Sequence, residues 1–319
     1  MIHFEGLVAA GFTPMDKLGN LRLDIIPAIV EHLIGDGIKG IYVCGSTGEG
    51  PSLSGQERKK VAEAYTKAAG GRIPIIVQVG HDSLTEARDL ARHAWTIGAN
   101  AISAVAPHYY KLDSVDTLVD CLVEIGSAVP QIPLFYYHIP ALSGIALPMR
   151  EFIDAACEHV PNFAGIKYSA ATIYDYQDCL DYAQGRCQIF FGCDEMLLSA
   201  LCVGAQAAIG STYNFAAPLY HRIINAFKQG DHATARQLQG CSVAMCRLLH
   251  DYRGMPAIKT MMKLIGLDCG PTRLPLRALS IEETTRLRQE VEKIGFFDWT
   301  GKKLISLGDL QNKLAGSKH

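Results

Sequence analysis

The sequence lacks the signals that mark several large classes of protein. It has no run of about 18 apolar residues, the length needed to span a bilayer. Its first residues carry neither a charged n-region nor an unbroken apolar h-region, so we expect no signal peptide. Charges of both signs are interspersed, with a net charge of −2 and no basic stripe of the kind that binds nucleic acid. These absences favour a cytoplasmic protein, with neither a nucleic acid nor a membrane as partner.

Cysteine is plentiful, but it lacks the spacing of a disulfide framework or a zinc site. The chain has 10 cysteines in 319 residues, and no C-x-x-C pair and no N-x-[ST] glycosylation site occurs. Most of these cysteines fall inside predicted strands and helices, which favours free, buried thiols in a reducing compartment. No H-E-x-x-H motif or histidine cluster is present, so we expect no metal.

Short, β-branched apolar runs alternate with amphipathic helical stretches along the first 228 residues. The eight runs cover residues 7–10, 40–44, 75–79, 101–105, 134–137, 163–167, 189–191 and 207–209. Their continuous apolar character is typical of parallel strands covered on both faces. Eight strands, each followed by a helix, predict a closed (β/α)₈ TIM barrel over residues 1–228. The alternative, a doubly wound open sheet, is disfavoured because no G-x-G-x-x-G follows the first strand.

The pattern changes after residue 228, where only helical periodicity remains. Three helices are predicted at residues 231–250, 255–265 and 280–294, and a loop rich in glycine and proline separates the last two. We therefore expect residues 229–319 to form a C-terminal three-helix extension packed on the barrel.

Polar candidates follow the carboxyl ends of the predicted strands, where active sites of TIM barrels lie. They are Ser46 and Thr47 after the second strand, Tyr137 at the end of the fifth, Lys167 at the end of the sixth, Asp194 and Glu195 after the seventh, and Ser211 after the eighth. Because all of these strand ends meet on one rim, the residues predict a single site.

Lys167 ends an otherwise apolar strand. An amine that loses its solvation is favoured in the neutral form, and a neutral amine is a nucleophile that forms a Schiff base with a ketone. The alternatives are a lysine that extends from the strand end to solvent and one that pairs with a carboxylate.

Ser46 and Thr47 lie among glycines, where hydroxyl groups and backbone N–H groups form a nest for an anion. A plain tight turn without a ligand is the alternative. The P-loop pattern G-x-x-x-x-G-K-[ST] is missing, so a carboxylate is a better guess than a polyphosphate.

Tyr137 and His138 are adjacent, so only one of them is expected to face the site. We favour Tyr137, whose hydroxyl can relay protons beside a lysine, and interpret His138 as structural. Asp194 and Glu195 are interpreted either as acids at a helix start or as groups that bind a polyhydroxylated substrate.

Five segments, in this order, carry a resemblance to a known family. They are GSTGE at 45–49, YHIPALSG at 137–144, GIK at 165–167, GCDE at 192–195 and GSTYN at 210–214. With them the chain resembles the N-acetylneuraminate lyase (sialic acid aldolase) branch of the pyruvate-dependent class I aldolases, a group that also contains dihydrodipicolinate synthase.

The resemblance implies a role for each candidate and requires no cofactor. Lys167 would form a Schiff base with pyruvate, Ser46 and Thr47 would hold the pyruvate carboxylate, and Tyr137 would relay the proton. The sugar and its glycerol tail would be bound by Gly192, Asp194, Glu195 and Ser211, and the hydroxyl of Ser169 would also contact the substrate. Tyr109, or its neighbour Tyr110, would reach a neighbouring subunit's site in a homotetramer.

One position separates the branches of this group. Dihydrodipicolinate synthases carry an arginine two residues after the proline that follows the fifth strand, whereas here Pro140 is followed by Ala141 and Leu142. The expected activity is therefore reversible cleavage of N-acetylneuraminate, a sialic acid, to N-acetylmannosamine and pyruvate. The alternatives are another pyruvate-dependent 2-keto acid aldolase and a non-catalytic barrel that binds sialic acid or pyruvate.

Overall fold

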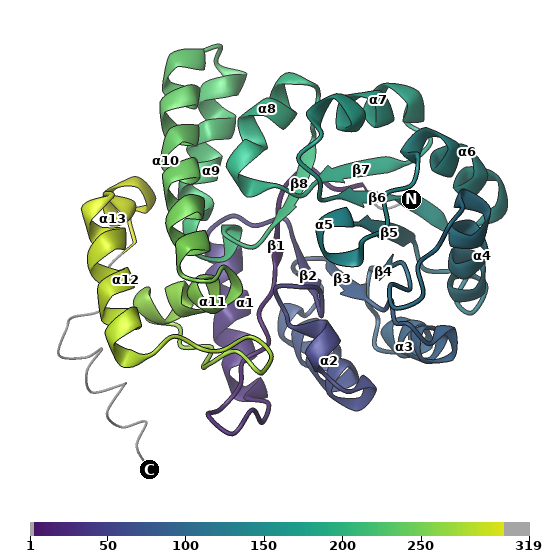
Figure 1. Ribbon diagram of the computed structural model, residues 1–319, viewed down its shortest axis with the longest axis horizontal. Coiled ribbons are helices and arrows are strands. Elements are labelled where there is room, and N and C mark those ends of the chain that lie inside the picture. The colour runs from purple at the N-terminus through teal and green to yellow at the C-terminus, as the bar shows by residue number, and fades with distance from the viewer. Residues whose placement is uncertain (1–2, 303–319) are drawn as a thin grey trace.

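Eight parallel strands form a closed barrel in the computed structural model, which describes residues 3–302 (Figure 1). Each strand pairs with the next along the chain, and β8 pairs with β1. The strands are β1 (Gly6–Ala10), β2 (Gly40–Val43), β3 (Ile75–Gln78), β4 (Ala101–Val105), β5 (Leu134–His138), β6 (Phe163–Tyr168), β7 (Gln188–Phe191) and β8 (Ala207–Gly210). The predicted TIM barrel is confirmed, and each predicted strand agrees with the observed bounds to within one residue at either end.

Helices follow the strands and cover the outside of the barrel. They are α1 (Ile26–Gly35), α2 (Gly55–Ala69), α3 (Leu84–Thr96), α4 (Val115–Gly126), α6 (Met149–His159), α7 (Ile173–Ala183), α8 (Leu197–Cys202) and α9 (Tyr213–Lys228). Shorter turns lie in the loops: α5 (Pro140–Ser143) and the 3₁₀ segments η1 (Leu23–Ile25), η2 (Gly50–Ser52) and η3 (Asp194–Met196). Three of the long helices begin at a serine, Ser54, Ser83 or Ser114, whose side chain accepts a hydrogen bond from the third backbone N–H of the helix.

Side chains alternate between the barrel interior and the layer of helices, because the side-chain period of a strand is two. The amino-terminal end of the interior is filled by three buried rings, Phe4, Phe135 and Phe190. Their centroids lie 5.2 to 6.3 Å apart in edge-to-face arrangements. These rings close the amino-terminal end of the barrel.

A bulge in β6 sets the direction of its last residues. Leu134 pairs with Phe163 and Phe135 pairs with Gly165, so β6 has one extra residue, Ala164. Gly165 has φ of +149°, and a Cβ at this position would lie 1.7 Å from the carbonyl oxygen of Gln188. Only glycine fits here. Beyond the bulge, Lys167 lines the cavity at the upper end of the barrel.

The three predicted C-terminal helices are α10 (His232–Asp251), α11 (Met255–Leu264) and α12 (Ile281–Lys293). Figure 1 shows α10 alongside α9, with α12 and α13 (Phe296–Thr300) farther from the barrel. The single-turn helix α13 was not predicted, because one turn is too short to show a periodicity.

One hydrophobic core joins the barrel to these helices, since it includes Met245, Leu249, Met261 and Leu287. The division at residue 228 stays a prediction, and residues 303–319 of the expected extension lie outside the described part of the chain. No helix within residues 3–302 has the length and hydropathy needed to cross a membrane.

Candidate active site

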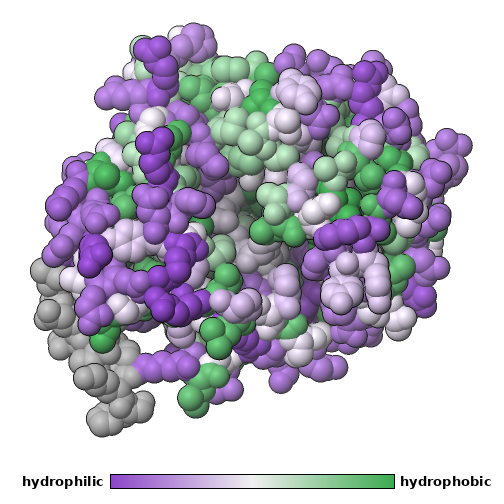
Figure 2. All heavy atoms as spheres, in the orientation of Figure 1, coloured by the Kyte–Doolittle hydropathy of each residue, from purple (hydrophilic) through white to green (hydrophobic). Residues whose placement is uncertain are grey.

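The carboxyl ends of the strands open into a cavity of about 520 Å³. Figure 2 shows this face of the molecule hollowed near its centre. Nine of the ten predicted site residues line the cavity: Ser46, Thr47, Tyr137, Lys167, Ser169, Gly192, Asp194, Glu195 and Ser211. The structure therefore brings together residues from five loops and strand ends that are far apart in sequence.

Lys167 is buried, with 4% of its surface exposed, and lies between two aromatic rings. Its Nζ is 4.1 Å from the ring centre of Tyr42 and 3.9 Å from that of Tyr137. No carboxylate within residues 3–302 forms an ion pair with it, so neither alternative suggested by the sequence agrees with the structure. The amine thus faces the cavity without a carboxylate partner.

Tyr137 and His138 point to opposite sides of β5. The Tyr137 hydroxyl lies 3.3 Å from Oγ of Ser46, inside the cavity. The His138 ring packs between Tyr136 and Tyr168, with centroid distances of 6.0 and 5.0 Å. Burial lowers the pKa of His138 to about 4, so this imidazole is neutral at neutral pH. His138 therefore lies outside the group of residues that face the cavity.

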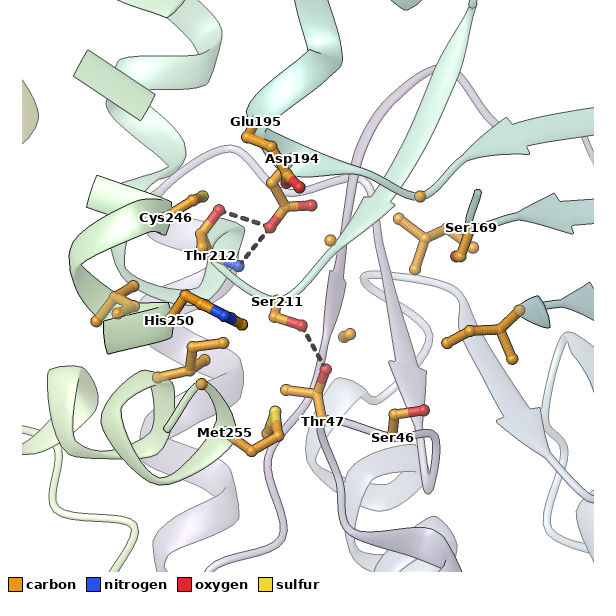
Figure 3. Close-up of a pocket in the computed structure, with 18 of the residues that line it drawn as sticks. Ser46, Thr47, Ser169, Asp194, Glu195, Ser211, Thr212, Cys246, His250 and Met255 are labelled. Carbon is orange, nitrogen blue, oxygen red and sulfur yellow. Dashed lines mark hydrogen bonds between the residues drawn. The ribbon is translucent and has the colours of Figure 1, made fainter. Parts of the chain in front are cut away.

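Ser46 and Thr47 lie on a tight turn between β2 and α2. The turn begins and ends at residues with left-handed backbone angles, Cys44 with φ of 60° and Glu49 with φ of 54°. Oγ1 of Thr47 lies 2.6 Å from Oγ of Ser211, and this hydrogen bond connects the turn to the end of β8 (Figure 3). The hydroxyl groups of Ser46, Thr47 and Ser211 therefore lie on one side of the cavity.

Glu49, at the end of the same turn, faces away from the cavity and forms a buried ion pair with Lys259 of α11. The two side chains are 0% and 1% exposed, and Oε1 of Glu49 lies 2.7 Å from Nζ of Lys259. Oε2 of Glu49 accepts a hydrogen bond of 2.8 Å from the backbone N–H of Arg273. Nζ of Lys259 also donates to the carbonyl oxygen of Pro271, at 2.8 Å. The C-terminal helices thus hold the turn that carries Ser46 and Thr47.

Asp194 connects the ends of β7 and β8. Its Oδ2 accepts hydrogen bonds from the backbone N–H and the hydroxyl of Thr212, at 2.8 and 2.6 Å (Figure 3). Burial raises the pKa of Asp194 to about 6, although the hydrogen bonds from Thr212 act in the opposite direction. The neighbouring Glu195 is exposed at the cavity and has no hydrogen-bond or ion-pair partner among residues 3–302. The two adjacent acids thus lie in very different environments.

Ser169 and Gly192 face each other across the ends of β6 and β7. A Cβ at Gly192 would lie 2.0 Å from Oγ of Ser169, so glycine makes room for this hydroxyl. The hydroxyl of Ser169 is buried and has no hydrogen-bond partner within the described residues. A buried hydroxyl without a partner is costly, so it is a good position for a contact with a ligand.

Tyr109 is the predicted residue that the structure does not bring to the cavity. It lies in the loop between β4 and α4, with 77% of its surface exposed, and its ring packs edge-on against that of Tyr110 at 5.2 Å. Oδ1 of Asp82 accepts the backbone N–H groups of His108 and Tyr109, which fixes this loop. A role for Tyr109 at another subunit's site stays a prediction.

One wall of the cavity comes from the C-terminal helices and was missed by the sequence reasoning. Its residues are Val243, Cys246, Arg247, Leu249, His250, Gly254, Met255 and Ile258. The periodicity of α10 indicates which face is apolar, but no sequence motif shows that polar residues beside that face meet the strand ends.

Within residues 3–302, no three His, Cys, Asp or Glu side chains converge as metal ligands would.

Comparison with known proteins identifies the family. The model of the dihydrodipicolinate synthetase family matches residues 3–294. The chain belongs to this family. The chain is 39% identical to the N-acetylneuraminate lyase of Homo sapiens over 306 residues. The match covers 94% of this chain and 95% of that protein.

Solved structures of the family agree with the fold. The N-acetylneuraminate lyase of Proteus mirabilis superposes with a TM-score of 0.90 at 38% identity, and the match covers 92% of this chain and all of that one (100%). A catalytic lysine mutant of Ruminococcus gnavus sialic acid aldolase superposes with a TM-score of 0.85 at 28% identity, covering 92% of this chain and 97% of that one. The resemblance recognised from the five sequence segments is therefore confirmed at the level of the family.

Proposed function

We propose that this protein is an enzyme that cleaves N-acetylneuraminate reversibly to N-acetylmannosamine and pyruvate. The observation that carries the proposal is the buried amine of Lys167, which faces the cavity beside Tyr137 and pairs with no carboxylate among residues 3–302. Relatives named N-acetylneuraminate lyase, one of them 39% identical over 94% of the chain, support this choice of substrate. The catalytic lysine of the Ruminococcus gnavus sialic acid aldolase supports a lysine as the reactive group.

The proposed reaction proceeds through a Schiff base. The neutral amine of Lys167 attacks the C2 ketone of the open-chain sugar, and loss of water gives an iminium ion. The C3–C4 bond then breaks, its electrons move into the iminium, and the C4 hydroxyl becomes the aldehyde of N-acetylmannosamine as its proton is relayed through Tyr137. The resulting enamine takes up a proton at C3, and water hydrolyses the imine to pyruvate and free Lys167. The iminium is the electron sink, so the proposed reaction uses no metal or organic cofactor.

The remaining residues bind the two ends of the substrate in this proposal. Ser46 and Thr47 hold the carboxylate next to C2, which the distance of 3.3 Å between Oγ of Ser46 and the Tyr137 hydroxyl supports. The residues proposed to bind the sugar are Ser169, Gly192, Asp194, Glu195 and Ser211. The partnerless hydroxyl of Ser169 and the exposed carboxylate of Glu195 support this assignment.

We also propose a cytoplasmic homotetramer in which Tyr109 approaches the site of a neighbouring subunit. The exposed pair of rings at Tyr109 and Tyr110 supports a contact with another chain, because large exposed aromatic groups are typical of interfaces. The ten free thiols support a reducing compartment.

The deciding experiment combines turnover with chemical trapping. The purified protein is incubated with N-acetylneuraminate and a chelator, and the release of pyruvate is followed. In parallel, pyruvate is added with borohydride, and the modified residue is located by peptide mass spectrometry. We expect chelator-insensitive release, an adduct on Lys167, and neither in Lys167→Ala. The control is Lys263→Ala, which changes a partly buried lysine outside the cavity and should retain both pyruvate release and the adduct on Lys167.

Other outcomes separate the alternatives. An adduct on Lys167 without cleavage of N-acetylneuraminate would indicate a different 2-keto acid aldolase. A folded protein that forms no adduct would be a non-catalytic binding barrel. Substantial turnover by Lys167→Ala would exclude the covalent mechanism.

A further inference from the structure

The cavity has donor groups on α10 that the proposed chemistry does not use. Arg247 and His250 both line it, and since they are three residues apart on the helix they lie on the same face. Figure 3 shows the His250 ring directed toward Ser211, on the side of the pocket opposite Ser169. Two side chains able to donate hydrogen bonds therefore approach the cavity from a helix outside the barrel.

Neither side chain is committed to a protein partner. Within residues 3–302, Arg247 and His250 form no hydrogen bond and no ion pair with their side chains. The next arginine along the chain, Arg253, forms a two-pronged ion pair with Glu283, with N–O distances of 2.6 and 2.9 Å. Arg247 has no ion-pair partner in the described part of the chain, even though Glu195 lines the same cavity. The cavity wall thus presents unpaired donors, Arg247 and His250, together with an unpaired acceptor, Glu195.

We propose that Arg247 and His250 bind the end of the substrate that does not react, the hydroxylated three-carbon tail of N-acetylneuraminate. This inference rests on the proposed function. Lys167, Tyr137 and Ser46 hold the keto acid at the strand ends, so the rest of a nine-carbon chain must extend toward another wall. A tail of hydroxyl groups offers both acceptors for Arg247 and His250 and donors for Glu195, which matches the mixed character of this wall. The C-terminal helices then determine how long a substrate the enzyme prefers.

The test compares two substrates across a set of variants. The first substrate is N-acetylneuraminate, and the second is its seven-carbon analogue, made by mild periodate cleavage of the tail followed by borohydride reduction. We measure KM and kcat for wild type, Arg247→Ala, His250→Ala and Arg247→Lys. The control is Arg236→Ala, which removes the same charge from an exposed position of α10 outside the cavity.

We expect Arg247→Ala and His250→Ala each to raise KM for N-acetylneuraminate about tenfold, the effect of losing one charge-assisted or strong hydrogen bond. The kcat value changes little, because the contact is distant from the bonds that break. Neither variant changes KM for the seven-carbon analogue by more than about twofold, since the group that they bind is missing. Arg247→Lys recovers part of the loss, and Arg236→Ala behaves as wild type.

An equal rise of KM for both substrates, or no change for either, would overturn the assignment of the tail to this wall. Both of those results leave the aldolase intact, because wild type still cleaves both compounds. Failure of wild type to cleave either compound would instead contradict the proposed function. Unchanged turnover of the analogue by each variant also shows that the variant is folded.

Discussion

The buried ion pair between Glu49 and Lys259 predicts a large loss of stability when one partner is removed. Both side chains are almost fully buried, and each makes a further hydrogen bond: Glu49 accepts one from the backbone N–H of Arg273, and Lys259 donates one to the carbonyl oxygen of Pro271. In Lys259→Met, a side chain of similar size replaces the amine and leaves the carboxylate of Glu49 buried without its charged partner. Breaking a buried pair in this way costs about 3–5 kcal/mol. We expect a loss of this size in the free energy of unfolding measured by urea denaturation.

A double-mutant cycle isolates the pair from other effects of the substitution. Glu49→Gln, Lys259→Met and the double variant are compared, and we expect the double variant to be more stable than the sum of the single changes predicts, by at least about 1 kcal/mol. Lys263→Met is the matched control on the same helix, where the ion pair with Asp268 is partly exposed at 15% and 35% and is expected to contribute less than about 1 kcal/mol.

The pair also has an expected effect on the site, because Glu49 lies two residues after Thr47. Lys259→Met should raise KM for the keto acid, since the turn that carries Ser46 and Thr47 loses its anchor. The reasoning is refuted if Lys259→Met unfolds within about 1 kcal/mol of wild type or if the single changes are additive.

Three further predictions follow from the same geometry. Gly165→Ala should lower the free energy of unfolding, measured by urea denaturation, by about 3 kcal/mol or more, because the new Cβ would meet the backbone of β7. The control is Gly71→Ala, at φ of +75° in open space, which should lower it by only about 1 kcal/mol. Asp194, whose pKa is raised by burial from 3.8 to about 6, binds more protons in the folded state, so its contribution to stability is present below pH 4 and is lost as the pH rises through 6. The stability of wild type relative to Asp194→Asn should therefore fall by up to about 3 kcal/mol between pH 4 and pH 7 in denaturation series, and a constant difference would contradict the burial argument. Tyr137→Phe should keep the adduct on Lys167 in borohydride trapping but lose most of kcat for N-acetylneuraminate, and unchanged kcat would exclude Tyr137 from the proton relay.

The barrel and the position of the site were predictable from the sequence because both depend on local patterns. Eight apolar runs of strand length, separated by helical periodicity, determine a closed parallel barrel, and the residues after each run must then lie on one rim. Lys167 and Tyr137 line the cavity, as predicted, because each lies within one residue of the carboxyl end of its strand. His138 was separated from Tyr137 by the two-residue period alone.

The rest of the site depends on contacts between distant segments, which no local pattern records. Lys259 is an ordinary lysine in an amphipathic sequence, and only the packing of α11 against the turn after β2 shows that it meets Glu49. In the same way, Arg247 and His250 have the composition of a solvated helix face. Their place at the cavity follows from how α10 packs against η3 and α9, the segments that follow β7 and β8. Asp194 has the position that the sequence predicts, but only the structure shows that it accepts hydrogen bonds from Thr212.

The three phenylalanine rings that close the amino-terminal end of the barrel have a consequence for the order of events in turnover. Phe4, Phe135 and Phe190 pack across the interior, so we expect substrates to enter and leave through the cavity at the carboxyl ends of the strands. In the proposed reaction, the pyruvyl part of the substrate is attached to Lys167, and the sugar lies between it and solvent. The aldehyde must therefore depart before pyruvate does, and in the reverse direction pyruvate must enter first. Excess pyruvate should accordingly occupy the empty enzyme and compete directly with N-acetylneuraminate, whereas excess N-acetylmannosamine should not.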